Sequence, residues 1–187
     1  MQSNRLQILM EVAIFAVIAL ILDLFIPSIG SLKLTVKMMP IIIVALRRGL
    51  LPGILSGFLW GFLQFVMGDA QILTLSQFVL EYFVAFAMVG FAGIASKPLQ
   101  NTLRAEPDNV RKQILLVTSG LVLGSFLRYV IHFIAGFIFW GHYAPAGQGA
   151  VYYSFAVNGT AFLSETITCL IVLVLLAASY KRIILVD

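Results

Sequence analysis

ILLVTSGLVLGSFLRYVIHFIAGFIFW, residues Ile114–Trp140, is a long apolar run that only Arg128 and His132 interrupt. The hydrocarbon core of a bilayer is about 30 Å thick, and an α-helix needs roughly 20 apolar residues to cross it. The run meets this requirement, and it therefore predicts a transmembrane helix. The remainder of the chain shows whether this helix is one anchor or part of a larger membrane domain.

The composition of the whole chain is that of an integral membrane protein. Of the 187 residues, 61% are hydrophobic and 11% are charged, whereas a soluble domain has about 45–50% apolar and about 25% charged residues. This excludes a soluble enzyme, a soluble nucleic-acid binder and a secreted disulfide scaffold. The single cysteine, Cys169, lies inside an apolar run, so an internal disulfide and a cysteine-based metal cluster are also excluded.

Five further apolar runs predict additional spans, and two of the six predicted helices are short. The chain is therefore predicted to be an all-α integral membrane protein with six transmembrane helices in one domain, residues 1–187. Residues 97–112 are the only stretch that resembles a soluble linker, and they are too few for a second domain. The N-terminal run is not predicted to be a cleavable signal peptide, because it is span-length and contains Glu11 and Asp23. The five runs are 8–26, 38–46, 54–67, 75–95 and 152–180.

The positive charges predict the orientation of the spans. With six spans and an internal N-terminus, the outer segments hold only Lys33 and Lys37, and Arg128 lies within a span. This bias predicts a multi-pass protein of the plasma membrane with both termini in the cytoplasm. It also accounts for the net charge of +4 without a nucleic-acid partner. The cations on the inner side are Arg5, Arg47, Arg48, Lys97, Arg104, Arg111, Lys112, Lys181 and Arg182.

Several catalytic and nucleotide-binding motifs are missing from the sequence. It contains no GxxxxGK[ST], no HExxH and no GxSxG. No cofactor or metal ion is therefore expected. If the protein moves a solute against a gradient, a partner must supply the energy.

Polar residues inside the predicted spans mark the candidate site, because a charge in hydrocarbon is costly and is usually functional. In the fifth span, Arg128, His132, Gly136 and Trp140 follow one another at intervals of four residues and form one helical stripe. In the last span, Glu165 lies close to the depth of Arg128. We therefore predict a structural ion pair between these two residues.

The outer half of the predicted bundle gathers one carboxylate, an imidazole, amides and aromatic rings. The carboxylate is Glu81, and Gln77 lies four residues before it on the same helical face. Such a mixture favours a small aromatic heterocycle with a positive charge, because aromatic faces attract cations and the carboxylate supplies the countercharge. The residues alone do not name the ligand. The set is Glu81, Gln77, Tyr82, His132, Trp140, Tyr153 and Asn158, with Trp60 and Gln64 nearby.

Four stretches resemble a known family. The sequence is similar to the thiamin-specific substrate-binding (S) components of energy-coupling factor (ECF) transporters, the ThiT family, over nearly the whole chain. The resemblance implies the S-component fold, with a high-affinity thiamin pocket near the outer surface. It further implies two kinds of partner besides the bilayer, an ECF transmembrane coupling subunit and two cytoplasmic ATPases. The stretches are IVALRRG (43–49), SQFVLEY (76–82), RYVIHFIAGFIFWGHYAP (128–145) and VYYSFAVNG (151–159).

The resemblance also assigns residues to the pocket and to partner docking. In the family's first helix, alanines four apart dock on the coupling subunit, and here the small residues are Ala13, Ala16 and Ala19, with packing inside the bundle as the alternative role. Two loops depart from the family pattern, since residues 29–32 and 71–73 stand where an aromatic residue is expected. By match to the motifs, the pocket residues are Glu81, Tyr82, His132, Gly136, Trp140, Tyr153 and Asn158.

Two alternatives remain open at the level of sequence. An S component for riboflavin or biotin is the nearest rival, although riboflavin is uncharged and biotin is anionic, so that neither gives Glu81 an obvious role. An intramembrane enzyme using Glu81 and His132 is the second rival. It is weaker because one glutamate and one histidine are too few to fix a metal ion, and no nucleophile motif accompanies them.

Overall fold

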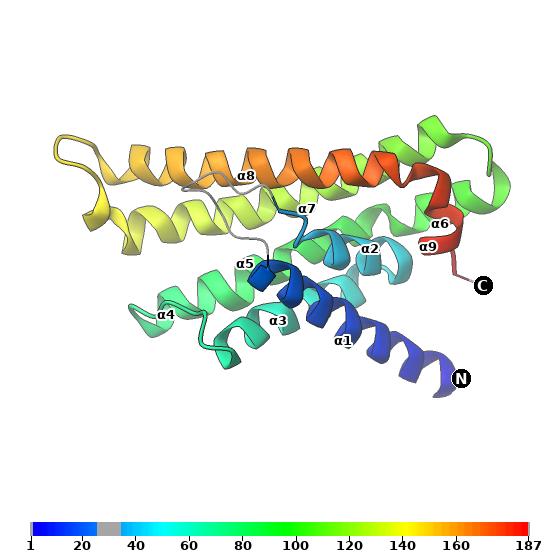
Figure 1. The fold of residues 1–187 in the computed structure, drawn as a ribbon, viewed down its shortest axis with the longest axis horizontal. Coiled ribbons are helices and arrows are strands. Elements are labelled where there is room, and N and C mark those ends of the chain that lie inside the picture. The colour runs from blue at the N-terminus through cyan, green and yellow to red at the C-terminus, as the bar shows by residue number, and fades with distance from the viewer. Residues whose placement is uncertain (1, 26–34, 187) are drawn as a thin grey trace.

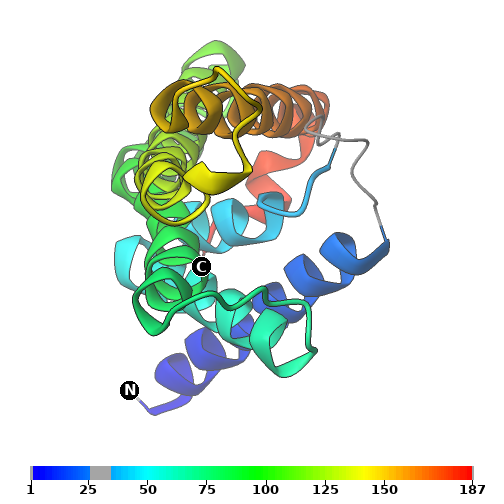
Figure 2. The same cartoon turned by 90° about the vertical axis from the view of Figure 1, so that its left-hand side faces the viewer.

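The computed structural model describes residues 2–25 and 35–186, and every regular element within these ranges is helical. The chain passes back and forth along a bundle, and α1 begins at the same end of the bundle at which α9 lies (Figure 1). The helix α2 lies in the middle of the bundle when it is viewed end-on (Figure 2). The principal helices are α1 (Gln2–Phe25), α2 (Met39–Arg48), α3 (Leu50–Val66), α7 (Val110–Phe139) and α8 (Ala150–Leu175).

A long composite helix lies between α3 and α7. It spans residues 75–105 without a break but changes its hydrogen-bonding pattern along the way. Its middle contains a π-helical segment, in which each turn holds more residues than in an α-helix and which occurs frequently at functional sites. Its parts are α4 (Leu75–Phe78), the π-helix η1 (Val79–Val84), α5 (Ala85–Met88), the 3₁₀-helix η2 (Val89–Ala95) and α6 (Ser96–Ala105).

The six apolar runs correspond to the six helical segments described above, which confirms the all-α fold. Four helices are long and apolar enough to cross a bilayer within the described ranges, namely 5–25, 75–105, 110–139 and 150–175. The two segments predicted to be short are α2, with 10 residues, and α3, with 17. The protein is therefore a multi-pass membrane protein.

The predicted linker at residues 97–112 is wrong in most of its length, because α6 continues the fourth span as far as Ala105. Pro98 lies at the junction where the 3₁₀-helix η2 passes into α6, and the helix continues through it to Ala105. Leu99 and Leu103 are buried on one face of α6, while Lys97 and Arg104 remain exposed on the other. The charged residues that indicated a linker therefore belong to the solvated face of an amphipathic helix.

The last span ends at Leu175, five residues before the predicted end, and the chain after it reaches the end of α2. Two short helices, η4 (Ala177–Ser179) and α9 (Tyr180–Ile183), make this turn. Arg47 at the end of α2 donates hydrogen bonds to the backbone oxygens of Ile183 and Leu185 at 3.1 and 2.8 Å. These bonds attach the C-terminal segment to the end of α2.

Glycines four residues apart on α3 allow the composite helix to lie unusually close. Gly53, Gly57 and Gly61 face Gly90, Phe86 and Tyr82 respectively. A Cβ atom at Gly57 or Gly61 would clash with the backbone oxygen of Phe86 or Tyr82. Small residues at this spacing are the usual means by which transmembrane helices approach one another. These contacts fix the position of η1, which carries Glu81.

The bundle encloses a network of buried charges. Arg128 Nη1 donates to Glu165 Oε2 at 2.6 Å, which confirms the predicted ion pair. The guanidinium also lies 5.5 Å from the ring centroid of Trp60 and 5.0 Å from that of Phe86. Cation–π attraction therefore adds to the ion pair.

Lys37, which the count of charges assigned to an outer segment, belongs to the same network of buried charges. Its side chain is buried, with Nζ 2.6 Å from Asp23 Oδ1 and 3.7 Å from Glu165 Oε1. Asp23 also accepts a hydrogen bond from the buried side chain of Gln64. The buried carboxylate of Glu165 and the half-buried one of Asp23 therefore compensate the charge of this buried lysine, because a buried charge is costly unless it is paired.

Candidate ligand-binding site

Two cavities lie beside α7 and α8, and the larger is lined by residues from the end of α7 and the start of α8. Figure 1 shows that these parts of α7 and α8 are at the end of the bundle away from α9. The volume of the larger cavity is about 520 Å³, which is within the range of small-molecule sites. The walls come from the loop before α4, from η1, from the last turns of α7 with the 3₁₀-helix η3 (Gly141–Tyr143), and from the first turns of α8. The lining residues are Gln71, Glu81, Gly136, Trp140, Tyr143, Tyr153, Val157 and Asn158.

Glu81 places a carboxylate on the wall of this cavity. The π-helix η1 carries it, and the close approach of α3 at Gly61 holds that segment in place. Trp140 Nε1 donates to both carboxylate oxygens, at 3.0 and 3.2 Å. The side chain of Gln77 donates to Glu81 Oε2 as well. Donors from two helices therefore hold the carboxylate in one orientation.

Tyr82 acts on the cavity wall indirectly. Its hydroxyl oxygen accepts a hydrogen bond from the backbone N–H of Gln71 at 2.9 Å, and its ring stacks with that of Phe86. The side chain of Tyr82 is not among the lining groups. It supports the loop that carries Gln71.

Gly136 lies where α7 packs closely against α8 beside the cavity. A Cβ atom at this position would clash with Ser154 Oγ and would lie 2.8 Å from Asn158 Nδ2. Asn158 in turn donates to Ser154 Oγ at 3.2 Å, and Ser154 Oγ donates to the backbone oxygen of Phe133 at 2.7 Å. The glycine therefore allows the helices to pack closely and places the amide of Asn158 at the wall.

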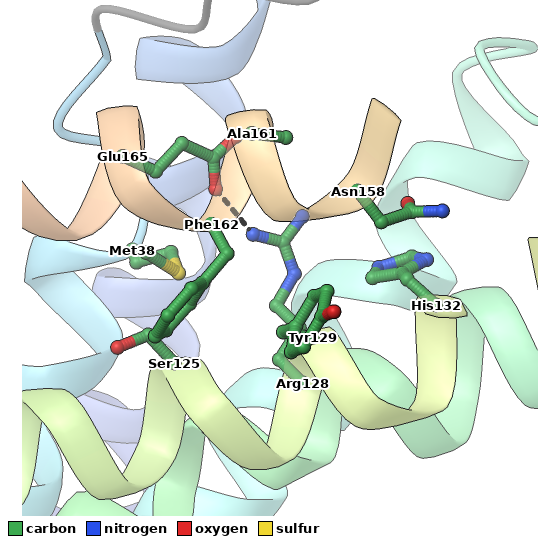
Figure 3. A pocket seen from close by; sticks show the side chains of 9 residues that line it. All are labelled: Met38, Ser125, Arg128, Tyr129, His132, Asn158, Ala161, Phe162 and Glu165. Carbon is green, nitrogen blue, oxygen red and sulfur yellow. Dashed lines mark hydrogen bonds and ion pairs between the residues drawn. The ribbon is translucent and has the colours of Figure 1, made fainter. Parts of the chain in front are cut away.

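A smaller cavity of about 80 Å³ lies deeper between α7 and α8, and His132 lines it (Figure 3). Asn158 lines both cavities, so the two are neighbours. In the close view, His132 and Asn158 lie on one side of the smaller cavity, while Arg128 reaches toward Glu165 on the other. His132 also contacts the ring of Phe86 edge-on, with centroids 6.2 Å apart.

Five of the seven pocket residues expected from the resemblance line the larger cavity, whereas Tyr82 does not and His132 lines the smaller one. The structure adds Gln71, Tyr143 and Val157, which the sequence reasoning did not select. Tyr143 follows Trp140 by three residues in the quoted motif, so its position was a usable signal. Trp60, expected near the cluster, is instead completely buried against Phe86, with ring centroids 4.4 Å apart. The five lining residues are Glu81, Gly136, Trp140, Tyr153 and Asn158.

Two loops depart from the family pattern, and the first of them, residues 29–32, lies outside the described part of the chain. In the second loop, Gln71 lines the cavity with an amide where an aromatic ring was expected, and Ile72 and Leu73 are exposed. This loop therefore contributes a polar group to the cavity.

The alanines of α1 do not share one exposed face. Ala16 and Ala19 are fully buried in the bundle, and only Ala13 is exposed. Ala16 and Ala19 therefore have the alternative role of packing inside the bundle, because small side chains let the backbone of α1 approach its neighbours.

The chemistry of the larger cavity follows from its residues. Among its lining residues in the described ranges, Glu81 alone carries a charge, and it is surrounded by the rings of Trp140, Tyr143 and Tyr153. Amides at Gln71 and Asn158 supply donors and acceptors. Such a wall can bind a cationic aromatic ring by stacking and by ion pairing. In the described ranges, no three His, Cys, Asp or Glu side chains are grouped to hold a metal ion.

Comparisons with known proteins agree over the full length. The family model described as Thiamine transporter protein (Thia_YuaJ) matches residues 9–185. The thiamine transporter ThiT of Lacticaseibacillus paracasei is 36% identical over 193 residues, covering 100% of this chain and 94% of that protein. The thiamine transporter ThiT of Bacillus subtilis is 34% identical over 192 residues, covering 100% and 98%. A solved structure of ThiT from Listeria monocytogenes has a TM-score of 0.91 at 35% identity, covering 98% of this chain and all of the other.

Proposed function

This chain belongs to the thiamine transporter protein family, and we propose that it takes up thiamin by binding it in the larger cavity. Proteins of this family are transporters rather than enzymes. The rival use of Glu81 and His132 as a catalytic pair has a further difficulty, because these side chains line different cavities.

The observation that carries the proposal is the carboxylate of Glu81, held toward a cavity whose other described lining residues are uncharged. Thiamin has a positively charged thiazolium ring and an aminopyrimidine with hydrogen-bond donors. A carboxylate supplies an acceptor for those donors and a countercharge for the ring. Trp140 and Tyr153 offer aromatic faces on which either ring can stack.

Riboflavin and biotin suit this cavity less well. Riboflavin is uncharged, and biotin carries a carboxylate that Glu81 would repel. Trp140 and Gln77 donate hydrogen bonds to Glu81 but carry no charge, so a ligand without positive charge would leave the carboxylate without a countercharge. We therefore propose thiamin rather than another vitamin.

We further propose that thiamin is captured from outside the cell and that ATP hydrolysis occurs on partner proteins. The sequence has no P-loop, so an energy-coupling factor module, made of a transmembrane subunit and two cytoplasmic ATPases, is the source of energy. The positive charges predict that both termini are cytoplasmic. Because α9 lies away from the larger cavity (Figure 1), that orientation places the cavity toward the outside. Ala13 and the exposed face of α1 around it remain available for docking.

A fluorescence titration of the purified protein tests the choice of ligand. Trp140 lines the cavity, so thiamin should quench the intrinsic fluorescence and saturate at one ligand per chain without ATP. Riboflavin and biotin serve as competitors. Tighter binding of either competitor than of thiamin, or no binding of thiamin by folded protein, would contradict the proposal.

A further inference from the structure

Gln77 does not line the larger cavity, yet its side chain joins two of the groups that do. It lies one helical turn before Glu81 and is completely buried. Its Nε2 donates to the backbone oxygen of Gln71 at 3.1 Å and to Oε2 of Glu81. Its Oε1 accepts a hydrogen bond from the backbone N–H of Leu73 at 3.0 Å.

One amide therefore fixes both the loop before α4 and the carboxylate on η1. Tyr82 strengthens the same arrangement by accepting a hydrogen bond from the backbone N–H of Gln71 at 2.9 Å. The hydroxyl of Thr74 caps the N-terminus of α4 by accepting a hydrogen bond from the backbone N–H of Gln77 at 3.1 Å. These contacts hold the backbone on each side of the amide, so that its position is set before any ligand binds.

An apolar side chain of similar size could not replace this amide. Glu81 would retain only the indole N–H of Trp140 as a donor, and the backbone groups of Gln71 and Leu73 would each lose a partner. A buried acceptor that loses a donor carries the full cost of its desolvation, and this cost favours other orientations of the side chain. The expected result is a carboxylate that no longer faces the cavity in one orientation.

We propose that Gln77 is a positioning residue for the ligand site, which orients Glu81 and ties it to the loop that carries Gln71. The proposal rests on the function proposed above, because it assumes that Glu81 contacts thiamin. Gln77 itself need not touch the ligand. Its effect on affinity passes mainly through the carboxylate.

A double-mutant cycle tests this route, because residues that act through each other have non-additive effects. Gln77→Leu should weaken thiamin binding about tenfold or more in the parent protein, as expected for a lost hydrogen bond to a charged group. In the Glu81→Gln background the same substitution should weaken binding by less than about threefold. Equal losses in both backgrounds, or no loss in the parent, would overturn the proposal.

Gln113 provides a matched control at the other end of the bundle. It is a buried glutamine whose Nε2 donates to the backbone oxygens of Glu106 and Pro107 at 3.3 and 2.9 Å, in the turn before its own helix. Gln113→Leu should therefore cost stability in the same way as Gln77→Leu without weakening thiamin binding. An equal loss of affinity in both variants would show that the effect of Gln77 is a general loss of structure.

A second readout needs no ligand, and so separates this proposal from the proposed function. The chain has two tryptophans, and Trp60→Phe leaves Trp140 as the reporter. In this background Gln77→Leu should shift the emission of Trp140, because Glu81, which accepts from the indole N–H, loses its other donor and is no longer held in one orientation. Gln113→Leu should leave the emission unchanged. An unchanged emission would refute the positioning role even if thiamin binds. A shift in protein that does not bind thiamin would instead contradict the proposed function alone.

If Gln77→Leu does not fold, Gln77→Met takes its place in both measurements with the same expected outcomes.

Discussion

Glu81→Gln should weaken thiamin binding far more than it weakens the fold. The substitution keeps the shape of the side chain and one acceptor oxygen while it removes the charge. In the structure the carboxylate receives donors on both oxygens, from Trp140 and from Gln77. The amide that replaces it must point its own N–H₂ group at one of these donors, and this costs about 1 kcal/mol of folding stability.

The loss of affinity should be larger, because the ligand is cationic and the charge is removed from its wall. Hydrogen bonds to charged groups contribute about 1.5–3 kcal/mol, which corresponds to a fall in affinity on the order of tenfold to a hundredfold. Isothermal titration calorimetry of the purified parent and variant measures this difference directly. Thermal unfolding of the same samples measures the change in stability.

Glu106→Gln is the matched control for this prediction. Glu106 lies in the turn between α6 and α7 and bonds Lys112 at 2.5 Å and Asn109 at 2.7 Å, away from the larger cavity. The exposed Lys112 ammonium holds the pKa of Glu106 below its usual value, so this glutamate is charged at neutral pH as well. Its substitution should leave the affinity for thiamin unchanged. If Glu81→Gln binds thiamin within twofold of the parent, the role given to this carboxylate is wrong.

Three further predictions concern the fold and the energetics. Arg128→Ala should lower the unfolding free energy by about 3 kcal/mol, the lower end of the cost of breaking a buried ion pair, because Lys37 still lies 3.7 Å from Glu165; thermal unfolding in detergent measures it, and an unchanged midpoint would contradict the structural role. Gly61→Ala should lower both stability and thiamin affinity, because the added Cβ clashes with the backbone of Tyr82; normal affinity by calorimetry would show that η1 does not depend on this contact. Proteoliposomes with this chain alone should not concentrate thiamin, whereas a coupling subunit with two ATPases should confer ATP-dependent uptake; concentrative uptake by the single chain would refute the division of labour.

The helices could be predicted from the sequence because hydrophobic length is a local property. The same reasoning failed at α6, where Lys97 and Arg104 indicated a linker although Leu99 and Leu103 form a buried stripe. The buried position of Lys37 could not be predicted either, because counting charges by segment cannot show that a side chain turns inward to meet Asp23 and Glu165. Both cases concern residues whose environment is set by distant parts of the chain.

Most residues of the candidate site could be predicted from the sequence, but the hydrogen bonds between them could not. Span length and helical periodicity give the approximate depth of each residue in the membrane. On this basis Glu81, Trp140 and Asn158 were predicted to lie at a similar depth. The hydrogen bond between Trp140 and Glu81 joins residues 59 positions apart, and no spacing rule predicts it. The π-helical turn at 79–84 is equally hidden, since nothing in its composition distinguishes it from α-helix. The glycines of α3 were a usable signal, because their spacing of four residues is characteristic of close helix contacts.

A structure determined with thiamin bound is the most direct test of the central claim, which is that this protein binds thiamin in the larger cavity against Glu81. The account predicts one thiamin molecule in that cavity, with a nitrogen of the ligand within about 3.2 Å of a Glu81 carboxylate oxygen and with an aromatic ring of the ligand against Trp140. Thiamin bound elsewhere, or bound in this cavity with Glu81 turned away from it, would contradict the claim.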